Sequence, residues 1–345
     1  LPVYIFDPAQ LAIGTLGTRQ LGVHRARFLL ESLAALDSAL RQRGSHLLVL
    51  QGNAEQLIPQ LAERFNLQEV LTLAEIAPKE NHHLNRVSER LGPVELRELQ
   101  DNGLLRIAQL PCQFCPLIEQ QLHVFQPRPA PEHLPPLPKG AAKLLTPLPT
   151  LSHLGLGEPL SVAASAFPFS GGEVAGRARL RDYLWNSQNV RQYQQTRDGM
   201  LGSEYSAKFS PWLANGSLSP RRVAAELRRY EAQCGRNDST QSLWTALLWR
   251  EFFRWTLVRH GTALLQQGAV PATEHPPQQL DERFRQWCHG RTGMPLVDAN
   301  MRELAATGYI SNRGRQVVAC YLVNDLQQDW RHGAAWFEEH LIDYD

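Results

Sequence analysis

The sequence predicts a two-part chain in which an α/β domain with a parallel sheet is followed by an all-α domain. Over the first ~100 residues, short apolar runs alternate with amphipathic stretches, a pattern typical of parallel α/β sheets. Residues 126–176 are rich in proline, which excludes regular helix and indicates a linker. From Arg177 to the end, apolar residues recur at helical spacing. We therefore expect one domain over residues 1–125 and another over residues 177–345.

The α/β part should consist of short strands separated by helices. The predicted strands are the apolar runs Val3–Phe6, His46–Leu50 and Glu69–Leu73. Amphipathic stretches predict helices over Val23–Arg43 and Ala54–Phe65, and Pro78 suits the first position of a third helix. Because a finished strand begins at residue 3, we expect that an earlier strand is missing.

In the helical part, capping residues predict where helices begin and end. Asp238 or Ser239 should cap a helix that carries apolar residues at helical spacing, namely Leu243, Leu247, Leu248 and Phe252. Gly308 should end a helix over Met301–Thr307. A further helix is predicted over Arg315–Asp329.

Composition narrows the class of protein. Of the 345 residues, 43% are hydrophobic and 20% charged, as in ordinary globular proteins. No apolar run approaches the ~18 residues that a membrane helix needs. The opening Leu1–Asp7 lacks the basic region and cleavage site of a signal peptide. Together with five scattered cysteines, these features predict a cytoplasmic protein that does not bind membranes.

Charge is unevenly distributed along the chain, although the net charge is only +1. Residues 170–260 carry 14 lysines and arginines but 8 aspartates and glutamates. This basic middle fits a polyanionic partner such as DNA, although charge alone favours a solvated arginine-rich surface.

Two segments of the helical part carry residues suited to binding phosphate. In Tyr205–Trp212, small hydroxyl residues flank a lysine and lead into a helix, which can cradle a phosphate; Ser-Pro pairs also simply start helices. In Leu247–Trp255, Arg250 and Arg254 lie four residues apart, where they could meet phosphates. The neighbouring aromatic Trp249 is equally compatible with a core position.

These segments, with Gly290–Arg315 and the closing Leu341–Asp345, resemble in order and spacing the flavin-binding half of the photolyase/cryptochrome family. The cryptochrome-DASH branch is resembled in particular, through Tyr205–Trp212, Asn237–Thr240, Asn312–Gln316 and Leu341–Asp345. The resemblance spans residues 1–345. It implies a Rossmann-like, photolyase-type antenna domain followed by a helical domain that holds FAD.

The resemblance also implies roles for individual residues. It assigns contacts with FAD to Tyr193, Ser206, Lys208, Phe209, Ser210, Arg250, Asn312, Arg315, Asp343 and Asp345. Of these, Arg315 and Asp343 should form an ion pair against the flavin ring. Contacts with the DNA lesion or its backbone fall to Trp249, Arg313 and Gln316. Trp249 is also a catalytic candidate, with Trp287 and Trp330 as outer members of a tryptophan chain that reduces the flavin; without the resemblance, these two would be core residues.

Several positions depart from the family pattern. Ala246 stands where the family has a glutamate that hydrogen-bonds the pyrimidine dimer, and Ala207 replaces a usual threonine. The family also begins with a further strand and helix, and continues beyond residue 345 with an asparagine near the flavin and the innermost tryptophan. We therefore expect a chain truncated at both ends.

The function implied first is enzymatic. Reduced FAD would use blue light to split cyclobutane pyrimidine dimers, preferably in single-stranded DNA, and the protein would act as a monomer. A non-enzymatic blue-light receptor is the alternative, favoured by Ala246, and a flavin-free degenerate fragment is a third hypothesis. A folate, methenyltetrahydrofolate, is a second chromophore candidate. The CxxC spacing of Cys112 and Cys115 has no second pair, so no metal site is expected.

Overall fold

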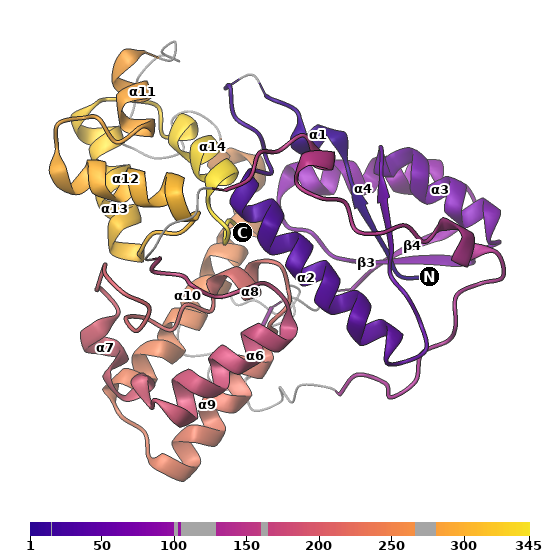
Figure 1. Ribbon diagram of the computed structural model, residues 1–345, viewed down its shortest axis with the longest axis horizontal. Helices are drawn as coiled ribbons and strands as arrows, with labels where there is room; N and C mark the ends of the chain where they lie inside the picture. The colour runs from indigo at the N-terminus through magenta and orange to yellow at the C-terminus, as the bar shows by residue number, and fades with distance from the viewer. Residues whose placement is uncertain (15, 100–102, 105–128, 160–164, 266–280) are drawn as a thin grey trace.

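The computed structural model describes residues 1–14, 16–99, 103–104, 129–159, 165–265 and 281–345. Within these residues the chain forms an α/β part and a helical part that lie side by side (Figure 1). The long helix α2 (Val23–Arg41) lies between them. This arrangement confirms the predicted fold class, whereas the predicted domain boundaries stay a prediction.

The strands of the α/β part form two parallel pairs. β1 (Val3–Phe6) pairs with β2 (Leu48–Gln51), with Val3 opposite Leu48. β3 (Glu69–Leu73) pairs with β4 (Glu95–Leu99). The predicted bounds of β1 and β3 are confirmed, and β2 begins two residues later than predicted. The sequence analysis missed β4 because its residues, Glu-Leu-Arg-Glu-Leu, are mostly charged and mostly exposed.

Helices cover these strands as predicted. After the short α1 (Pro8–Leu11), α2, α3 (Ala54–Arg64) and α4 (Pro78–Arg90) match the three predicted helices to within two residues at each predicted end. One apolar cluster joins Phe6 of β1 and Val49 of β2 to Leu33 of α2. A smaller cluster packs Ala62 of α3 against Val87 of α4.

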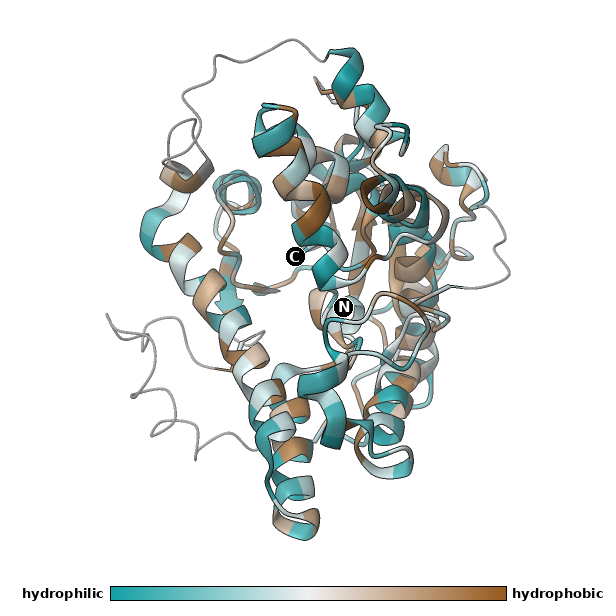
Figure 2. Cartoon of the chain, turned by 90° about the vertical axis from the view of Figure 1, so that its left-hand side faces the viewer, coloured by the Kyte–Doolittle hydropathy of each residue, from teal (hydrophilic) through white to brown (hydrophobic). Residues whose placement is uncertain are grey.

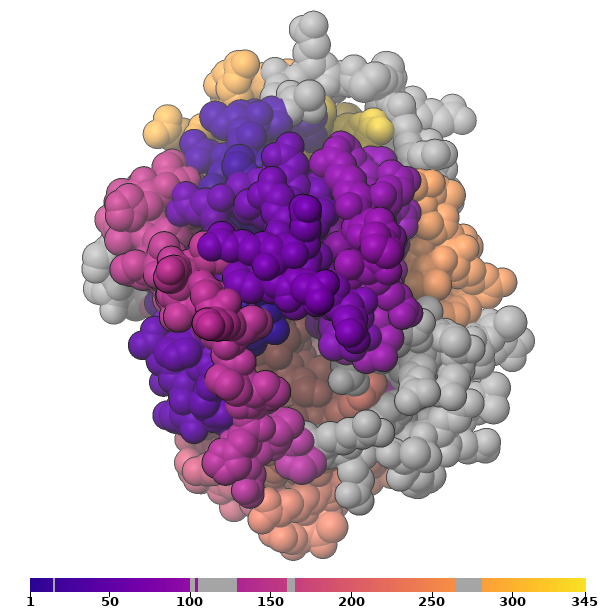
Figure 3. Space-filling model, turned by 90° about the vertical axis from the view of Figure 1, so that its right-hand side faces the viewer, coloured from indigo at the N-terminus to yellow at the C-terminus, as the bar shows by residue number. Residues whose placement is uncertain are grey.

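The proline-rich segment contains only short 3-10 turns where it is described, namely η3 (Ala141–Leu144) and η4 (Ser152–Leu154). Figure 3 shows it in magenta, running over the surface of the α/β part toward the helical part. Leu151, Leu154 and Leu156 are buried in the same apolar cluster as Phe6. The linker therefore also contributes to the core of the α/β part. Regular helix begins at Glu173, four residues before the predicted start.

The helical part consists of short and long helices. They are α6 (Glu173–Arg181), η5 (Asp182–Asn186), η6 (Asn189–Gln192), α7 (Tyr193–Thr196), α8 (Ser210–Ala214), α9 (Pro220–Cys234), α10 (Asp238–His260), η7 (Gly261–Leu265), α11 (Glu282–Cys288), α12 (Pro295–Thr307), α13 (Asn312–Cys320), η8 (Tyr321–Asp325) and α14 (Trp330–His340). Hydrophobic and hydrophilic residues are mixed along these helices (Figure 2), and buried apolar residues form two clusters, one including Trp212 and Trp244 and the other including Trp287 and Met301.

Three predicted helix ends need correction. The cap of α10 is Asn237, not Asp238 or Ser239: its side chain accepts from the Thr240 N–H, and the Thr240 hydroxyl completes a capping box. The helix predicted over Arg315–Asp329 begins at Asn312, because the Ser311 side chain caps it, and a π-helical turn ends it at Asp325. By contrast, Gly308 ends α12 as predicted, in the left-handed conformation (φ +72°).

Helix α2 joins the two parts. The backbone N–H groups of Gly171 and Gly172 donate to Glu31 and Ser32 of α2, at 2.6 and 2.9 Å. In the first turn of α2, His24 Nε2 lies 2.9 Å from the Ala305 carbonyl of α12. A side chain at Gly308 would collide with His24, since a Cβ there would lie 2.4 Å from the His24 Cβ. In the described part of the chain, every helix is too short or too polar to span a bilayer.

Candidate functional site

The loop before α8 takes a strained path that buries a lysine. Ser206 and Lys208 both have a backbone φ of +59°, a conformation that residues other than glycine rarely adopt. Arg179 of α6, itself 3% exposed, holds this loop by donating to the carbonyls of Ser203 and Ala207, at 3.3 and 3.4 Å. As a result Lys208 and Phe209 point inward, and Ser210 is the first residue of α8.

Lys208 is a buried cation with no hydrogen-bond acceptor among the described residues. Its side chain is 2% exposed, and its Nζ lies 3.2 Å from the centre of the Tyr205 ring. Burial, followed by the charge of Arg179, lowers the pKa of Lys208 to about 7. The nearby Glu303 is also affected, because burial raises the pKa of its carboxyl. A buried amino group without an acceptor is costly, and an anionic ligand would satisfy it.

Arg315 and Asp343 form the ion pair that the sequence analysis predicted. Arg315 donates through one nitrogen to both Asp343 oxygens, at 2.9 and 2.8 Å, and through Nε to the Ile310 carbonyl at 3.1 Å. The Asp343 side chain is fully buried. Burial alone would lower the pKa of Arg315, but the Asp343 carboxylate raises it. The Ile342 N–H donates to the Gly308 carbonyl, which places Asp343 beside α13.

Tyr309 connects the lysine to the ion pair. The Lys208 Nζ lies 5.0 Å and the Arg315 guanidinium carbon 5.4 Å from its ring centre. Ser210 hydrogen-bonds the Tyr309 side chain, although burial still raises the pKa of that phenol. The structure thus gathers Lys208, Ser210, Arg315 and Asp343 around one buried tyrosine. We call these five residues the Tyr309 cluster.

A second group of predicted residues lies on α10 and the end of the chain. Arg250 donates to Asp345 at 2.9 Å and lies 3.6 Å from the buried Glu251. Trp249 is 50% exposed and forms an aromatic patch with Phe252, at a ring distance of 5.4 Å, and with Phe253, which is 64% exposed. Trp249 is therefore not a core residue in the described structure.

The remaining predicted residues lie around α7 and α13. Arg313 and Gln316 are exposed on α13, where Arg313 donates to Gln316 at 3.3 Å and to Asp198 at 3.1 Å. Asn312 begins α13 and is exposed. Tyr193 is buried in α7. Ser206 is half-buried, whereas Phe209 is buried with its ring edge-to-face on Tyr183.

The two relay candidates differ in burial. Trp287 is fully buried in α11, donates to the Val318 carbonyl at 2.9 Å and stacks on Phe284. Trp330 begins α14 and is half-buried. Sequence reasoning did not propose Trp336, which stacks on His340 at a ring distance of 4.0 Å.

Sequence reasoning also missed Tyr309, Arg179 and Glu303. Tyr309 directly follows the helix-ending Gly308 inside the segment Gly290–Arg315, and this position could have identified it as a site residue. Arg179 and Glu303 carry no such signal, because single charged residues within helices are usually solvated. Among the described residues, no group of histidine, cysteine and acidic side chains could hold a metal. Cys112 and Cys115 lie outside the described residues.

Comparison with known proteins identifies the family. Residues 1–127 match the family model described as DNA photolyase, and residues 243–345 match the FAD binding domain of DNA photolyase. The chain is 41% identical to a cryptochrome DASH of Gloeobacter violaceus, over 99% of this chain and 70% of that protein. It is 40% identical to a cryptochrome DASH of Synechocystis sp., over 99% of this chain and 72% of that protein.

The chain belongs to the photolyase/cryptochrome family. Among solved structures, a cryptochrome of Synechocystis sp. PCC6803 superposes with a TM-score of 0.88 at 39% identity, over 99% of this chain and 73% of that chain. A class III photolyase of Agrobacterium tumefaciens, 24% identical, supports the fold alone, with a TM-score of 0.80 over 100% of this chain and 71% of that one.

As a member of the photolyase/cryptochrome family, this chain has FAD as its cofactor, which confirms that prediction. The Tyr309 cluster fits the cofactor's chemistry: the orphaned Lys208 amino group suits a diphosphate, and a buried Arg–carboxylate pair suits a polar ring. The contacts of individual residues with FAD stay predictions, and a folate antenna remains compatible with the fold.

Proposed function

We propose that this protein is a light-driven photolyase that splits cyclobutane pyrimidine dimers, preferably in single-stranded DNA. One observation carries the proposal: the buried Tyr309 cluster and the exposed aromatic patch at Trp249 belong to the same helical part. An ion pair between Arg250 of α10 and Asp345 links the helix that carries this patch to the segment that carries Asp343. The preference for single strands rests on the cryptochrome-DASH resemblance.

In this proposal the chain's own residues position the cofactor. Lys208 and Ser210 would meet the FAD phosphates, with Tyr193, Ser206 and Phe209 completing that side. Arg315 and Asp343 would lie against the flavin ring, near Asn312, Arg250 and Asp345. When bound and reduced, FAD supplies the photoexcited electron that opens the dimer.

The DNA would be held by stacking and by charge. A dimer turned out of the strand loses its stacking partners, and the half-exposed Trp249 offers a replacement surface. Arg313 and Gln316 are exposed donors that would contact the DNA backbone. Trp287 and Trp330 would relay electrons toward the flavin.

A blue-light receptor is the second candidate, and Ala246 favours it. This residue is half-buried against the core cluster of α10 and cannot hydrogen-bond a dimer. In that case the flavin would still respond to light, but a partner protein would read the change.

The test is a photorepair assay. The purified, FAD-loaded protein should split a defined thymine dimer in a single-stranded oligonucleotide under blue light, measured by chromatography. Trp249→Ala should weaken dimer binding by about tenfold or more, whereas Val258→Ala, at another exposed position of α10, should not. Flavin photoreduction without any dimer splitting would instead support the receptor.

A further inference from the structure

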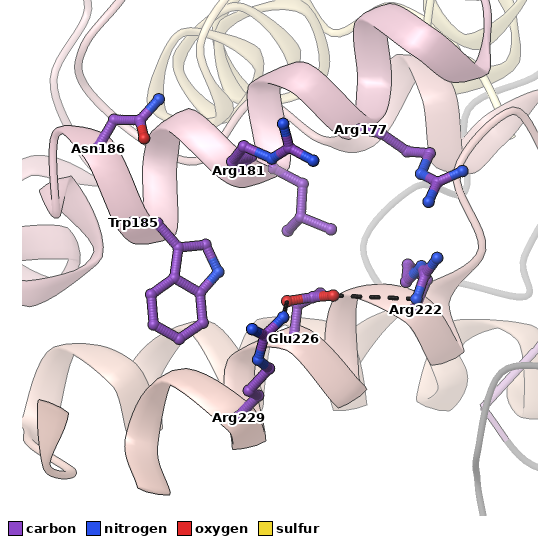
Figure 4. Close-up of a pocket in the computed structure, with 8 residues that line it drawn as sticks. Arg177, Arg181, Trp185, Asn186, Arg222, Glu226 and Arg229 are labelled. Carbon is purple, nitrogen blue, oxygen red and sulfur yellow. Dashed lines mark ion pairs between the residues drawn. The ribbon is translucent and has the colours of Figure 1, made fainter. Parts of the chain in front are cut away.

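A second charged site lies between α6 and α9, outside the proposed flavin site. It is a pocket of about 320 Å³, and Figure 4 shows arginines from both helices pointing toward it. The residues that matter for its chemistry are Arg177, Arg181, Trp185, Arg222, Glu226 and Arg229. On α6, Arg179 turns inward to the loop before α8, whereas Arg177 and Arg181 are exposed on the pocket side. Different faces of α6 therefore contribute to the proposed flavin site and to this pocket.

The helical spacing concentrates positive charge in this pocket. Arg177 and Arg181 are four residues apart on α6, and Arg222 and Arg229 lie seven apart on α9, so each pair shares a helix face. Glu226 is the single carboxylate among the described residues that line the pocket.

That carboxylate does not neutralise the pocket. Glu226 lies 3.9 Å from Arg222 and 3.6 Å from Arg229, while Arg177 pairs with Glu173 outside the pocket at 3.3 Å. Within the described part of the chain, no carboxylate comes within 4.0 Å of the Arg181 guanidinium. Facing arginines repel one another, so an anion in the pocket would relieve unfavourable charge and accept their hydrogen bonds.

Trp185 adds an aromatic wall to the charged pocket. It is half-buried, packs edge-to-face on Tyr230 at 5.3 Å, and has the Arg229 guanidinium 5.2 Å from its ring. Indole and guanidinium faces are the surfaces on which nucleic-acid bases stack. The volume lies at the lower end of the range for small-ligand sites, which suits one base with one phosphate.

We propose that this pocket binds a nucleotide, with its phosphate on the arginines and its base against Trp185. The nucleotide is either free or one unit of a single-stranded nucleic acid. A neighbouring pocket of about 540 Å³ shares Arg177 and Arg222 and extends to α2 and Leu134 of the linker, where an adjoining unit of a strand would fit. This site is independent of the proposed photolyase activity.

Calorimetric titration of the FAD-loaded protein tests the proposal, with adenosine monophosphate, inorganic phosphate and an undamaged oligothymidylate as probes. The pocket variant is Arg177→Gln with Arg181→Gln. Its matched control is Arg283→Gln with Arg285→Gln, which removes two exposed arginines from α11.

The pocket variant should weaken binding of the nucleotide, the oligothymidylate or both by about tenfold or more, since charge-assisted hydrogen bonds are lost. Trp185→Phe should weaken the nucleotide more than it weakens phosphate. Loss for the nucleotide identifies a free ligand, and loss for the oligothymidylate alone identifies a strand. Equal binding by the pocket and control variants, phosphate binding as tight as nucleotide binding, or no binding by the unmodified protein would overturn the proposal.

Discussion

Burying the Lys208 amino group without a hydrogen-bond acceptor costs free energy, which an anionic ligand would offset. The amino group is buried beside aromatic rings and has no acceptor among the described residues, so protonating it in the empty protein is unfavourable. Ordinary core positions hold apolar side chains instead. We therefore expect this amino group to contact an anionic ligand.

This burial predicts an unusual dependence of stability on pH. The pKa of Lys208 falls from 10.5 to about 7 on folding, so between these values the unfolded chain binds a proton that the folded chain lacks. The stability of the cofactor-free protein should therefore rise with pH from about 7 to 10.5, by up to about 1.4 kcal/mol per pH unit from this group.

Denaturant titrations at several pH values measure that slope. Lys208→Met should reduce it, whereas Lys139→Met, at an exposed linker position, should leave it unchanged. Identical slopes in the unmodified protein and Lys208→Met would contradict the assignment.

The Arg315–Asp343 pair should matter for both folding and cofactor binding. Asp343→Ala removes a fully buried carboxylate from Arg315, whose side chain is partly exposed, so the loss should be smaller than for a fully buried pair, about 2–3 kcal/mol. We expect a lower unfolding midpoint and a lower flavin-to-protein absorbance ratio. Glu282→Ala breaks an exposed pair with Arg285 and should cost no more than about 1 kcal/mol. Unchanged FAD content in a folded Asp343→Ala protein would remove this pair from the flavin site.

Ala246 should limit repair rather than lesion binding. Restoring a carboxyl by Ala246→Glu adds a hydrogen bond to the dimer as charge develops on it, worth ~3 kcal/mol or about a hundredfold in rate. We expect more dimers split per absorbed photon in this variant, with dimer affinity changed little. Ala246→Leu is the control for added bulk and should show no gain. Equal numbers of dimers split per absorbed photon in all three proteins would show that Ala246 does not limit repair.

At the scale of elements, α10 depends on its first turn. The capping box of Asn237 and Thr240 satisfies backbone donors that would otherwise be unpaired, at the start of the helix that carries Trp249 and Arg250. The position of the aromatic patch therefore depends on a cap that lies about three helical turns away.

Asn237→Ala should destabilise the protein by about 1 kcal/mol, because the Thr240 N–H loses its acceptor. Asn237→Asp keeps a capping oxygen but loses the hydrogen bond from Asn237 Nδ2 to the Arg191 carbonyl, so it should cost less than the alanine variant. Both values come from denaturant unfolding curves with unchanged slope. A loss as large in the aspartate variant as in the alanine variant would show that the cap itself is not the cause.

At the scale of the whole molecule, one helix couples the two parts. Contacts of α2 with Gly171, Gly172 and α12 bring the α/β part against the helical part. The exposed arginines of the helical part remain on its outer surface, where they can meet a polyanion.

DNA affinity should consequently fall as salt rises. Each phosphate that an arginine neutralises contributes a slope of about −0.7 in a plot of log affinity against log salt for single strands. Arg313→Gln should weaken binding of a dimer-containing strand and make this slope shallower by about that amount, measured by fluorescence anisotropy. Arg97→Gln, at an exposed position of β4 in the α/β part, should leave the slope unchanged. Salt-independent binding by the unmodified protein would refute the role of phosphate contacts.

The sequence by itself determined the strongly patterned elements and one ion pair of the candidate site. Strong local patterns placed β1, β3 and the helices α2 to α4, because period-2 and period-3.6 apolar spacing are local properties. Motif resemblance paired Arg315 with Asp343 across 28 residues, and the structure contains that pair.

Only the tertiary structure decided which residues share one environment. Tyr309 joins the loop before α8 to the chain end, and α2 positions both parts, through contacts between residues far apart in sequence. The mostly charged β4 forms because β3 lies beside it, and Lys208 loses its solvent because other segments close over it. Burial and pairing at these positions are properties of packing, which no local pattern encodes.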